Sequence, residues 1–235
     1  MRVVALDTAT RATAAALADI AAGQSPSFAV ERYRERPAGA RPGHAAELLG
    51  AIEELLEAAG GGWGRVDRIA VGVGPGTFTG LRIGVASAQA LARAGGIPLV
   101  PVSSLHALGL GAAGLGSGVI LALIDARRGE VFAAGWRAGG DLLQAPSLPE
   151  PSVLAPRQLH EHAGPGCVAV GDGAVRFREV LEPLGVRVPA DDDPAHRVSA
   201  VNHCRLAVTI EPAPSPDAVQ PTYLRLPDAE IASAK

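Results

Sequence analysis

Lysine is nearly absent from this sequence, and its absence excludes several kinds of chemistry. The only lysine among the 21 basic residues is Lys235, the last residue, so every other basic side chain is an arginine. We therefore expect no lysine inside the fold that holds ATP phosphates, as in P-loop proteins and protein kinases, and none that forms a Schiff base.

The sequence also has few cysteines and a small net charge. Cys167 and Cys204 provide neither a disulfide framework nor a cysteine-based zinc site, which indicates a reducing compartment. The 21 basic and 24 acidic residues leave a formal charge of −3, which argues against a broad basic surface for independent binding to nucleic acid or membranes. Apolar residues, in contrast, make up 48% of the 235 residues, which is typical of a folded protein with a sizeable core.

No segment is predicted to cross a membrane. Asp7 interrupts the apolar run at the N-terminus, so we expect no signal peptide there. The uncharged run Leu105–Ile124 is long enough to span a bilayer, but five of its residues are glycines. We interpret it as a short helix, a glycine turn and a buried strand over Val119–Ile124.

The first half of the chain predicts three strands followed by alternating helices and strands. The expected strands are Val3–Leu6, Ala12–Leu17, Phe28–Arg36, Ile69–Val73 and Ile97–Val100. Apolar residues recur at helical spacing over Ala45–Ala59, which predicts an amphipathic helix, and a second helix is expected over Gly80–Ala94.

The second half repeats this plan with weaker signals. Val119–Asp125 and Val131–Trp136 predict a hairpin around residues 127–129, and a third strand is expected near Leu142. The later expected elements are a helical tendency over Leu159–Ala163, a strand over Cys167–Val170 and a helix over Arg176–Leu184.

Two duplicated α/β lobes with mixed sheets account for this arrangement. We place the first lobe at residues 1–102 and the second at 103–235, and a return of the last segment toward the first lobe stays open.

The loop over residues 74–80, rich in glycine, proline and threonine, joins a predicted strand to the second predicted helix. Such a loop can direct backbone N–H groups at an anion, although its spacing is not that of a P-loop. A tight turn with a threonine cap is the alternative. The helix that follows carries small side chains on nearly every side. This composition indicates either packing in the core or a surface for a partner.

Five stretches spread along the chain carry a resemblance to a known family. They are Val4–Thr10, Gly43–Leu49, Gly74–Ala92, Asp125–Val131 and Gln220–Arg225. Together and in this order they resemble the TsaB (YeaZ) family, a bacterial subunit needed to make N6-threonylcarbamoyladenosine at position 37 of tRNA. The loop and helix over 74–92 are the specific part of the resemblance.

The resemblance implies an actin-like ATPase fold, also called ribonuclease H-like, in two pseudo-duplicated lobes. In that superfamily an acid after the first strand and a second acid on the opposing hairpin flank the phosphates and metal of a nucleotide. Asp7, followed by Thr8, and Asp125 stand at these positions, and oxygen ligands suit Mg²⁺. Because the family has lost most of this cleft, the site is predicted to be vestigial. No cofactor is expected to be required, while weak or interfacial binding of ATP or ADP with Mg²⁺ stays open.

The histidines and the acidic cluster do not predict a metal site. No two of the six histidines stand at the His-x-x-x-His spacing of the related catalytic subunit TsaD. His160 and His162 would face different sides of a helix. Asp191–Asp193, which lies between prolines, is expected to be a solvated loop.

The resemblance further implies that the two predicted helices pair with TsaD. The predicted interface residues are His44, Leu48, Leu49, Ile52, Thr77, Phe78, Thr79, Arg82, Ile83, Ala86 and Ala90. In isolation the same patch is expected to be covered by a homodimer, since large apolar patches seldom stay exposed.

The leading hypothesis is a cytoplasmic, non-catalytic scaffold that pairs with TsaD, joins a larger complex with the ATPase TsaE and reaches tRNA only through that complex. No catalytic residue is assigned. The alternative is an active actin-fold ATPase or phosphotransferase that uses Asp7 and Asp125. A peptidase is the third reading, but the sequence offers no nucleophile–base arrangement; Ala45 even replaces the serine of the family's His-Ser-Glu run.

Overall fold

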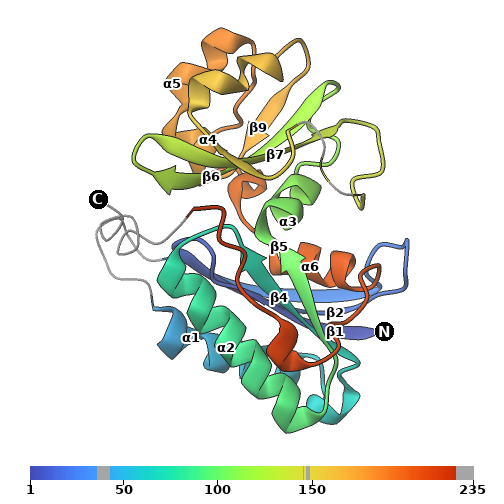
Figure 1. The fold of residues 1–235 in the computed structure, drawn as a ribbon. Helices are drawn as coiled ribbons and strands as arrows, with labels where there is room; N and C mark the ends of the chain where they lie inside the picture. Colours follow the sequence, from blue (N-terminus) through green and yellow to red (C-terminus); the bar gives the residue numbers. More distant parts are fainter. Residues whose placement is uncertain (36–42, 145, 147–148, 226–235) are drawn as a thin grey trace, which may run out of the picture.

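The computed structural model describes residues 1–35, 43–144, 146 and 149–225, and within these the chain forms two lobes, each built on one sheet (Figure 1). The strands of the first sheet are β1 (Arg2–Asp7), β2 (Ala12–Asp19), β3 (Phe28–Glu35), β4 (Arg68–Gly74) and β5 (Leu99–Ser103). The strands of the second are β6 (Val119–Arg127), β7 (Glu130–Arg137), β8 (Ser152–Leu154) and β9 (Val168–Val170).

The second sheet repeats the pairing pattern of the first. In the first sheet, ordered β3-β2-β1-β4-β5, β1 pairs antiparallel with β2 and parallel with β4. In the second, ordered β8-β7-β6-β9, β6 pairs antiparallel with β7 and parallel with β9. A parallel bridge between Val168 and Arg187 stands in place of the fifth strand. The predicted fold class, a ribonuclease H-like fold of two duplicated lobes with mixed sheets flanked by helices, is confirmed.

Helices cover both faces of each sheet. α1 (His44–Ala58) and α2 (Phe78–Gly95) lie side by side on the outer face of the first sheet (Figure 1). α3 (Ser104–Gly111) and α6 (Ala200–Ala207) lie between the two sheets, and α4 (Asp172–Arg176) and α5 (Arg178–Leu181) cover the second. Short 3-10 helices complete the described segments at Trp63–Arg65, Pro156–Glu161, Glu182–Leu184, Pro194–His196 and Pro216–Ala218.

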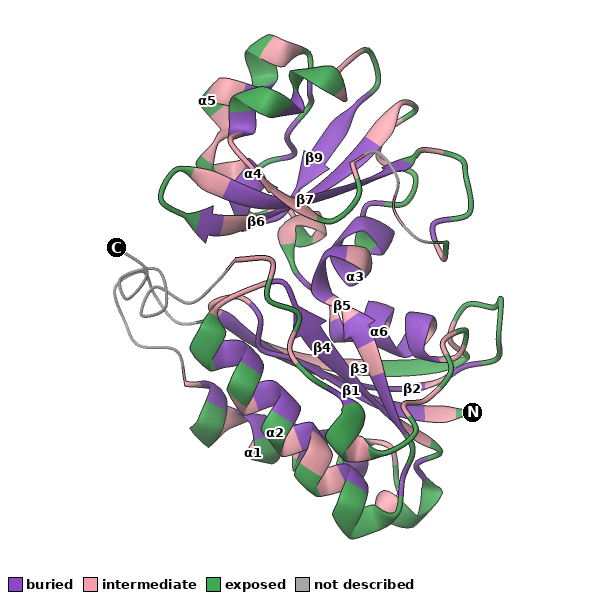
Figure 2. Ribbon diagram, in the orientation of Figure 1, coloured by how far each residue is buried: buried purple, intermediate pink, exposed green. Residues whose placement is uncertain are grey.

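The alternation of side chains along the strands creates the cores between these layers. On β1, Val3 and Ala5 face the core shared by the two sheets, whereas Val4 and Leu6 face the core under α1 and α2. The shared core contains residues of both sheets and of α3 and α6, so the lobes are joined by continuous apolar packing. Figure 2 shows this central layer as the most buried part of the molecule.

Most of the predicted elements are present, and the hairpin is a clear case. The turn between β6 and β7 contains Arg128 at φ 54 and Gly129 at φ 82, the left-handed pair that favours a tight hairpin turn. The run Leu105–Ile124 is α3, a glycine turn and the start of β6, as expected. Within the described residues no helix is both long and apolar enough to cross a bilayer.

Two predictions in the second half are wrong in detail. The residues around Leu142 form a turn rather than a strand, because the carboxylate of Asp141 accepts the N–H of Leu143, and β8 is the strand that pairs with β7. The single helix expected over 176–184 is instead the end of α4, the short helix α5 and a 3-10 helix, since Phe177 leaves the helical region at φ −110 and ψ 22.

Most of residues 200–225 pack on the first lobe, whereas Arg225 donates to the carbonyl of Ala126 in the second lobe at 2.7 Å. α6 contacts β1 and β2, although the sequence did not predict this helix because Asn202 and His203 interrupt its apolar pattern. Further along, Ala213 N–H donates to the carbonyl of Leu99 at 2.9 Å and Thr222 N–H donates to that of Val73 at 2.7 Å. We refer to residues 211–225 as the C-terminal strap; it runs alongside α2 (Figure 1).

Candidate functional site

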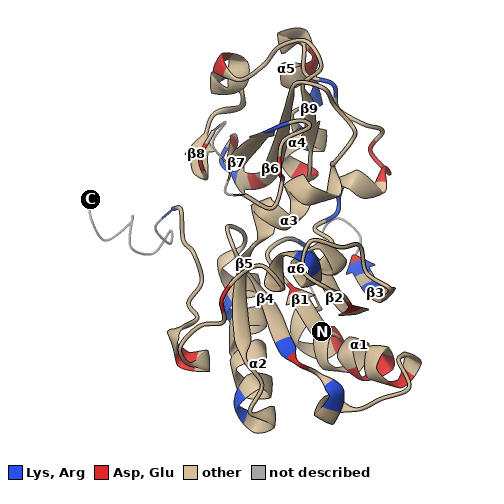
Figure 3. Cartoon of the chain, turned by 90° about the vertical axis from the view of Figure 1, so that its right-hand side faces the viewer, with Lys and Arg blue, Asp and Glu red and all other residues tan. Residues whose placement is uncertain are grey.

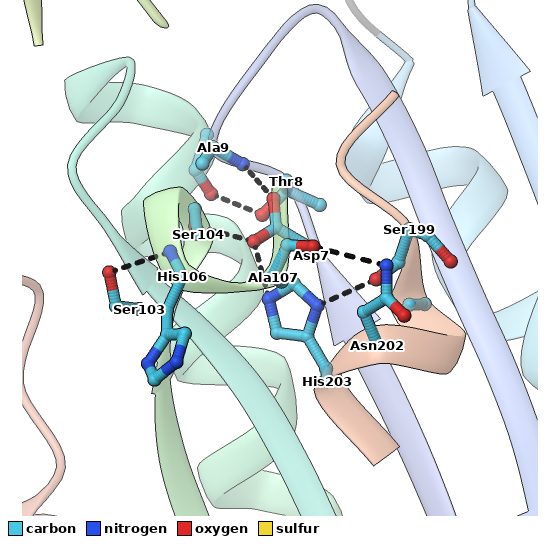
Figure 4. A network of polar contacts seen from close by, with 12 residues as sticks. Asp7, Thr8, Ala9, Ser103, Ser104, His106, Ala107, Ser199, Asn202 and His203 are labelled. Atoms are coloured by element: carbon cyan, nitrogen blue, oxygen red, sulfur yellow. Dashed lines mark hydrogen bonds and ion pairs between the residues drawn. The ribbon is translucent and has the colours of Figure 1, made fainter. Parts of the chain in front are cut away.

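Asp7, the acid that would face a nucleotide, lies inside the protein at the end of β1 with 2% of its surface exposed. Its Oδ1 accepts the N–H of Ala9 at 2.7 Å, and its Oδ2 accepts the hydroxyl of Ser104 at 2.5 Å. The same Oδ2 lies 3.0 Å from Nε2 of His203 on α6 (Figure 4). Both carboxylate oxygens are therefore engaged by groups of this chain.

The turn after β1 is also covered by the glycine loop that sequence analysis singled out. Thr77 N–H donates to the carbonyl of Ala9 at 2.7 Å, and the hydroxyl of Thr8 donates to the carbonyl of Gly80 at 2.7 Å. A Cβ on Gly72, Gly76, Gly80 or Gly84 would lie within 2.3 Å of an atom of residues 7–9. Four glycines at four-residue spacing thus let β4, the loop and α2 approach this turn closely.

Asp125, the second predicted acid, pairs with arginines instead. Its Oδ2 lies 2.9 Å from Arg176 and 3.1 Å from Arg127, and its side chain is 7% exposed. Its backbone N–H donates to Asp172. Within the described residues no three metal-binding side chains cluster, and the carboxylates of Asp7 and Asp125 both contact side chains of this chain.

A cavity of about 350 Å³ does lie between the lobes, but it is lined by other residues. Tyr33 and Glu35 come from the first sheet, and Asp172 and Arg197 come from the second half of the chain; the guanidinium of Arg197 lies 5.2 Å from the centre of the Tyr33 ring. No local signal in the sequence points to this cavity, because residues that line it, such as Tyr33 and Asp172, are more than a hundred residues apart. The acidic loop 191–193 borders it, and Asp191 pairs with Arg178.

The exposed face of α2 carries a compact cluster of large side chains. Phe78 is 37% exposed and Tyr223, from the C-terminal strap, is 40% exposed, with their ring centroids 5.3 Å apart. The guanidinium of Arg82 stacks 3.9 Å from the Phe78 ring centre, and its Nε donates to the Tyr223 hydroxyl at 3.3 Å. A shallow groove of about 620 Å³ continues from Arg82 along Ala86 and Gln89. We call Phe78, Arg82 and Tyr223 the aromatic cluster.

The structure divides the predicted interface residues into two groups. Phe78, Thr79, Arg82, Ala86 and Ala90 are exposed on α2, Leu49 is exposed on α1, and Thr77 and Ile83 are half-buried. His44, Leu48 and Ile52, in contrast, are at most 2% exposed, so their assignment to a surface is a correction: the apolar stripe of α1 faces its own sheet. Tyr223 was not predicted, although it lies in one of the five family-like stretches.

Figure 3 shows that charge also distinguishes the two outer helices. Acidic side chains gather along α1, whereas α2 contains no acidic residue and only two arginines, Arg82 and Arg93. α2 is therefore the less charged surface of the first lobe.

His44, which is buried, and His106, which is half-buried, are expected to make the stability of the fold depend on pH. Burial lowers the pKa of His44, which contacts Thr13, and that of His106, which contacts the carbonyl of Leu142, below the ordinary value of 6.5. As the pH falls, these histidines bind protons in the unfolded chain before they do so in the folded chain. They therefore stabilise the fold above about pH 6.5, and this contribution is lost as the pH falls toward their folded pKa values.

We therefore expect the urea midpoint to fall between about pH 7.5 and about pH 5.5. His106→Gln, which keeps a donor for Leu142, should make that fall shallower. An equal fall in this variant and the parent chain would contradict the assignment to His106.

The comparisons with known proteins agree with the fold. The family model described as "TsaD: tRNA N6-adenosine threonylcarbamoyltransferase" matches residues 35–165. The Escherichia coli tRNA threonylcarbamoyladenosine biosynthesis protein TsaB is 33% identical over 204 residues, 82% of this chain and 84% of that protein. An uncharacterised Mycobacterium tuberculosis protein is 34% identical over 97% of this chain and 93% of its own length. The solved structure of YeaZ from Pseudomonas aeruginosa superimposes with a TM-score of 0.73 at 27% identity, covering 95% of this chain and 99% of that one.

The fold and the site define a two-lobed ribonuclease H-like protein whose first acid is enclosed and whose outer helix face is exposed. With a relative 33% identical over most of its length, the chain belongs to the TsaB (YeaZ) family of tRNA threonylcarbamoyladenosine biosynthesis proteins. The resemblance seen in the sequence is confirmed.

Proposed function

We propose that this chain is a non-catalytic subunit that pairs with TsaD and supports transfer of threonylcarbamoyl from threonylcarbamoyl-adenylate to adenosine 37 of tRNA. The observation that carries the proposal is the state of Asp7: the acid needed for nucleotide chemistry is enclosed and fully engaged by this chain's own groups. No catalytic step is assigned to a residue of this chain.

The exposed side of α2 supports its role as the pairing surface. Tyrosine and arginine are the residue types that most often carry binding energy at protein interfaces, and the aromatic cluster contains both. Arg82, Ala86 and Ala90 follow one another at four-residue spacing, so they form a single stripe beside this cluster. A second helix can approach the small side chains of this stripe closely.

The same surface accounts for the proposed homodimer. In isolation, two copies of the chain would cover their α2 faces in a homodimer, which TsaD replaces by a heterodimer. TsaE joins the larger complex, and tRNA is reached through the complex in the cytoplasm. ATP or ADP with Mg²⁺, if held at all, belongs at the joint between subunits rather than at Asp7.

Native co-purification tests the pairing. The tagged chain, expressed at its natural level, should retain the host's TsaD through gel filtration, and deleting its gene should abolish N6-threonylcarbamoyladenosine in bulk tRNA. Recovery of the chain without TsaD, together with unchanged tRNA modification in the deletion strain, would overturn the proposal.

Calorimetry and a turnover assay separate this function from the alternative of an active ATPase. We expect no binding of ATP with Mg²⁺ to the isolated chain and no hydrolysis. Tight binding, with hydrolysis lost in an Asp125→Asn variant as well as in Asp7→Asn, would establish the alternative instead. Asp125 lies outside the buried network of Asp7, so its variant controls for loss of folding.

We also expect the isolated chain to show no useful affinity for tRNA at physiological salt. Its net charge is −3, and affinity for a phosphate backbone requires many clustered cations. A gel shift with purified chain at micromolar concentration is the measurement, and a clear shift at physiological salt would contradict the expectation.

A further inference from the structure

Three successive residues of the C-terminal strap contact three different parts of the molecule. The Tyr223 ring lies beside Phe78 on α2, with their centroids 5.3 Å apart. Leu224 packs against the core that the two sheets share. Arg225 reaches the second lobe, where its Nη1 donates to the backbone carbonyl of Ala126 at 2.7 Å. The strap therefore connects the exposed face of α2 to the β6–β7 hairpin.

The β6–β7 hairpin offers Arg225 two acceptors. The pairing of β6 with β7 shifts register between Asp125 and Arg127, so Ala126 is an extra residue that is left without a partner in β7. The carbonyl of Ala126 can therefore accept from outside the hairpin, and because this residue is 6% exposed, water has little access to it. The carboxylate of Glu130, in the same hairpin, forms an ion pair with Nη2 of Arg225, although not in the geometry of a hydrogen bond.

The preceding part of the strap is fixed to the first lobe. The side-chain amide of Gln89 on α2 donates to two backbone carbonyls of the strap, at 2.9 and 3.1 Å. Thr222 N–H donates to the carbonyl of Val73 on β4 at 2.7 Å. Two residues separate this bond from Arg225. So short a link cannot absorb a displacement of the hairpin without moving Tyr223.

We propose that Arg225 is a clasp between the lobes, which fixes the end of the strap to the β6–β7 hairpin and thereby holds Tyr223 on the face of α2. A guanidinium suits this task, because its donors point in several fixed directions and can serve a carbonyl and a carboxylate at once. The position of the second lobe thus determines whether the aromatic cluster on α2 is complete. The inference rests on the proposed function only where it treats α2 as the pairing surface.

Amide hydrogen exchange of the purified chain, followed by NMR, tests the clasp. Arg225→Met keeps an apolar stem and removes both polar contacts, so the Thr222 N–H should exchange about tenfold faster. Glu130→Gln, on the hairpin, removes only the ion pair of a partly exposed carboxylate and should accelerate the same amide about threefold. The amides of β1, which lie in the core, should change less, because the strap opens locally.

Arg157→Met is the matched control, because Arg157 is exposed on a 3-10 helix of the second lobe, and it should leave the Thr222 amide unchanged. The double variant Arg225→Met with Glu130→Gln should exchange no faster than Arg225→Met alone, since both changes remove the same ion pair. An unchanged Thr222 amide in Arg225→Met, effects of the two variants that multiply, or β1 amides that accelerate as much as Thr222 would overturn the proposal.

Pairing with TsaD provides a second measurement. The exchange data give the fraction of chains in which the strap is docked, and the apparent affinity of Arg225→Met for TsaD should fall in proportion to that fraction. If this variant releases the strap and yet pairs as tightly as Arg157→Met, the clasp does not control the pairing surface and this part of the proposal is refuted. If Ala86→Glu also pairs normally, α2 is not the pairing surface, and exchange in the purified chain still decides whether Arg225 is a clasp.

Discussion

Gly80→Ala is expected to lower the free energy of unfolding by about 3 kcal/mol. A Cβ at this position would lie 2.0 Å from the backbone carbonyl oxygen of Thr8 and 2.5 Å from the Thr77 hydroxyl. Residue 8 directly follows β1, and its hydroxyl donates to the carbonyl of Gly80, so its backbone cannot move away cheaply and the strain outweighs the gain of about 1 kcal/mol in helix propensity. Urea unfolding followed by circular dichroism measures the loss.

Gly50→Ala is the matched control, because Gly50 is also a helical glycine of the first lobe. Its Cβ would meet nothing within 4 Å, so only the propensity gain remains and stability should rise by about 0.5–1 kcal/mol. If Gly80→Ala and Gly50→Ala changed stability in the same direction, the close packing of α2 on the turn after β1 would not explain the effect of Gly80→Ala.

Ala86→Glu and Ala90→Glu are expected to abolish assembly while leaving the monomer folded. Both alanines are exposed in the isolated chain, where a new glutamate changes stability by no more than about 0.5 kcal/mol. Enclosed in a helix–helix interface, the same carboxylate is an unpaired charge, and we expect at least about 100-fold weaker homodimerisation and pairing with TsaD. Light scattering and co-purification measure these two effects, and circular dichroism checks the fold.

Two controls separate charge from size and from position. Ala86→Gln adds the same bulk without charge and should weaken assembly less than Ala86→Glu. Ala190→Glu places the charge on an exposed loop of the second lobe and should leave assembly intact. Folded Ala86→Glu and Ala90→Glu variants that still form both the homodimer and the TsaD pair would refute the α2 interface.

The sequence predicted the elements of the first lobe well, because their signals are local. Apolar residues at helical spacing predicted α1, and continuous apolar runs predicted β1 and β4, which are buried on both faces. In the second lobe the same rules failed where side chains of local turns decided the backbone, as with Asp141 beside Leu142. α6 was not predicted because some of its buried side chains are polar, so apolar residues do not recur at helical spacing along it.

The candidate site shows the same division. The resemblance placed Asp7, Thr8 and Asp125, yet whether an acid faces solvent or a partner within the chain depends on residues far away in sequence. His203 is 196 residues from Asp7, and nothing near it in the sequence marks it as a neighbour of that carboxylate. The inward direction of Leu48 and Ile52 also follows from the sheet beneath α1, since an apolar stripe fits a core and an interface equally well.

By itself, the sequence determined the two-lobed α/β class, the family and the absence of lysine-based chemistry, because periodicity, motif order and composition are properties of the chain alone. Only the tertiary structure decided that Asp7 is enclosed, that Tyr223 joins Phe78 and Arg82, and which side of α2 is exposed. These features depend on how closely segments that are distant in sequence approach one another. For α2, four glycines that contact the turn after β1 determine this distance. Local patterns contain no measure of that distance.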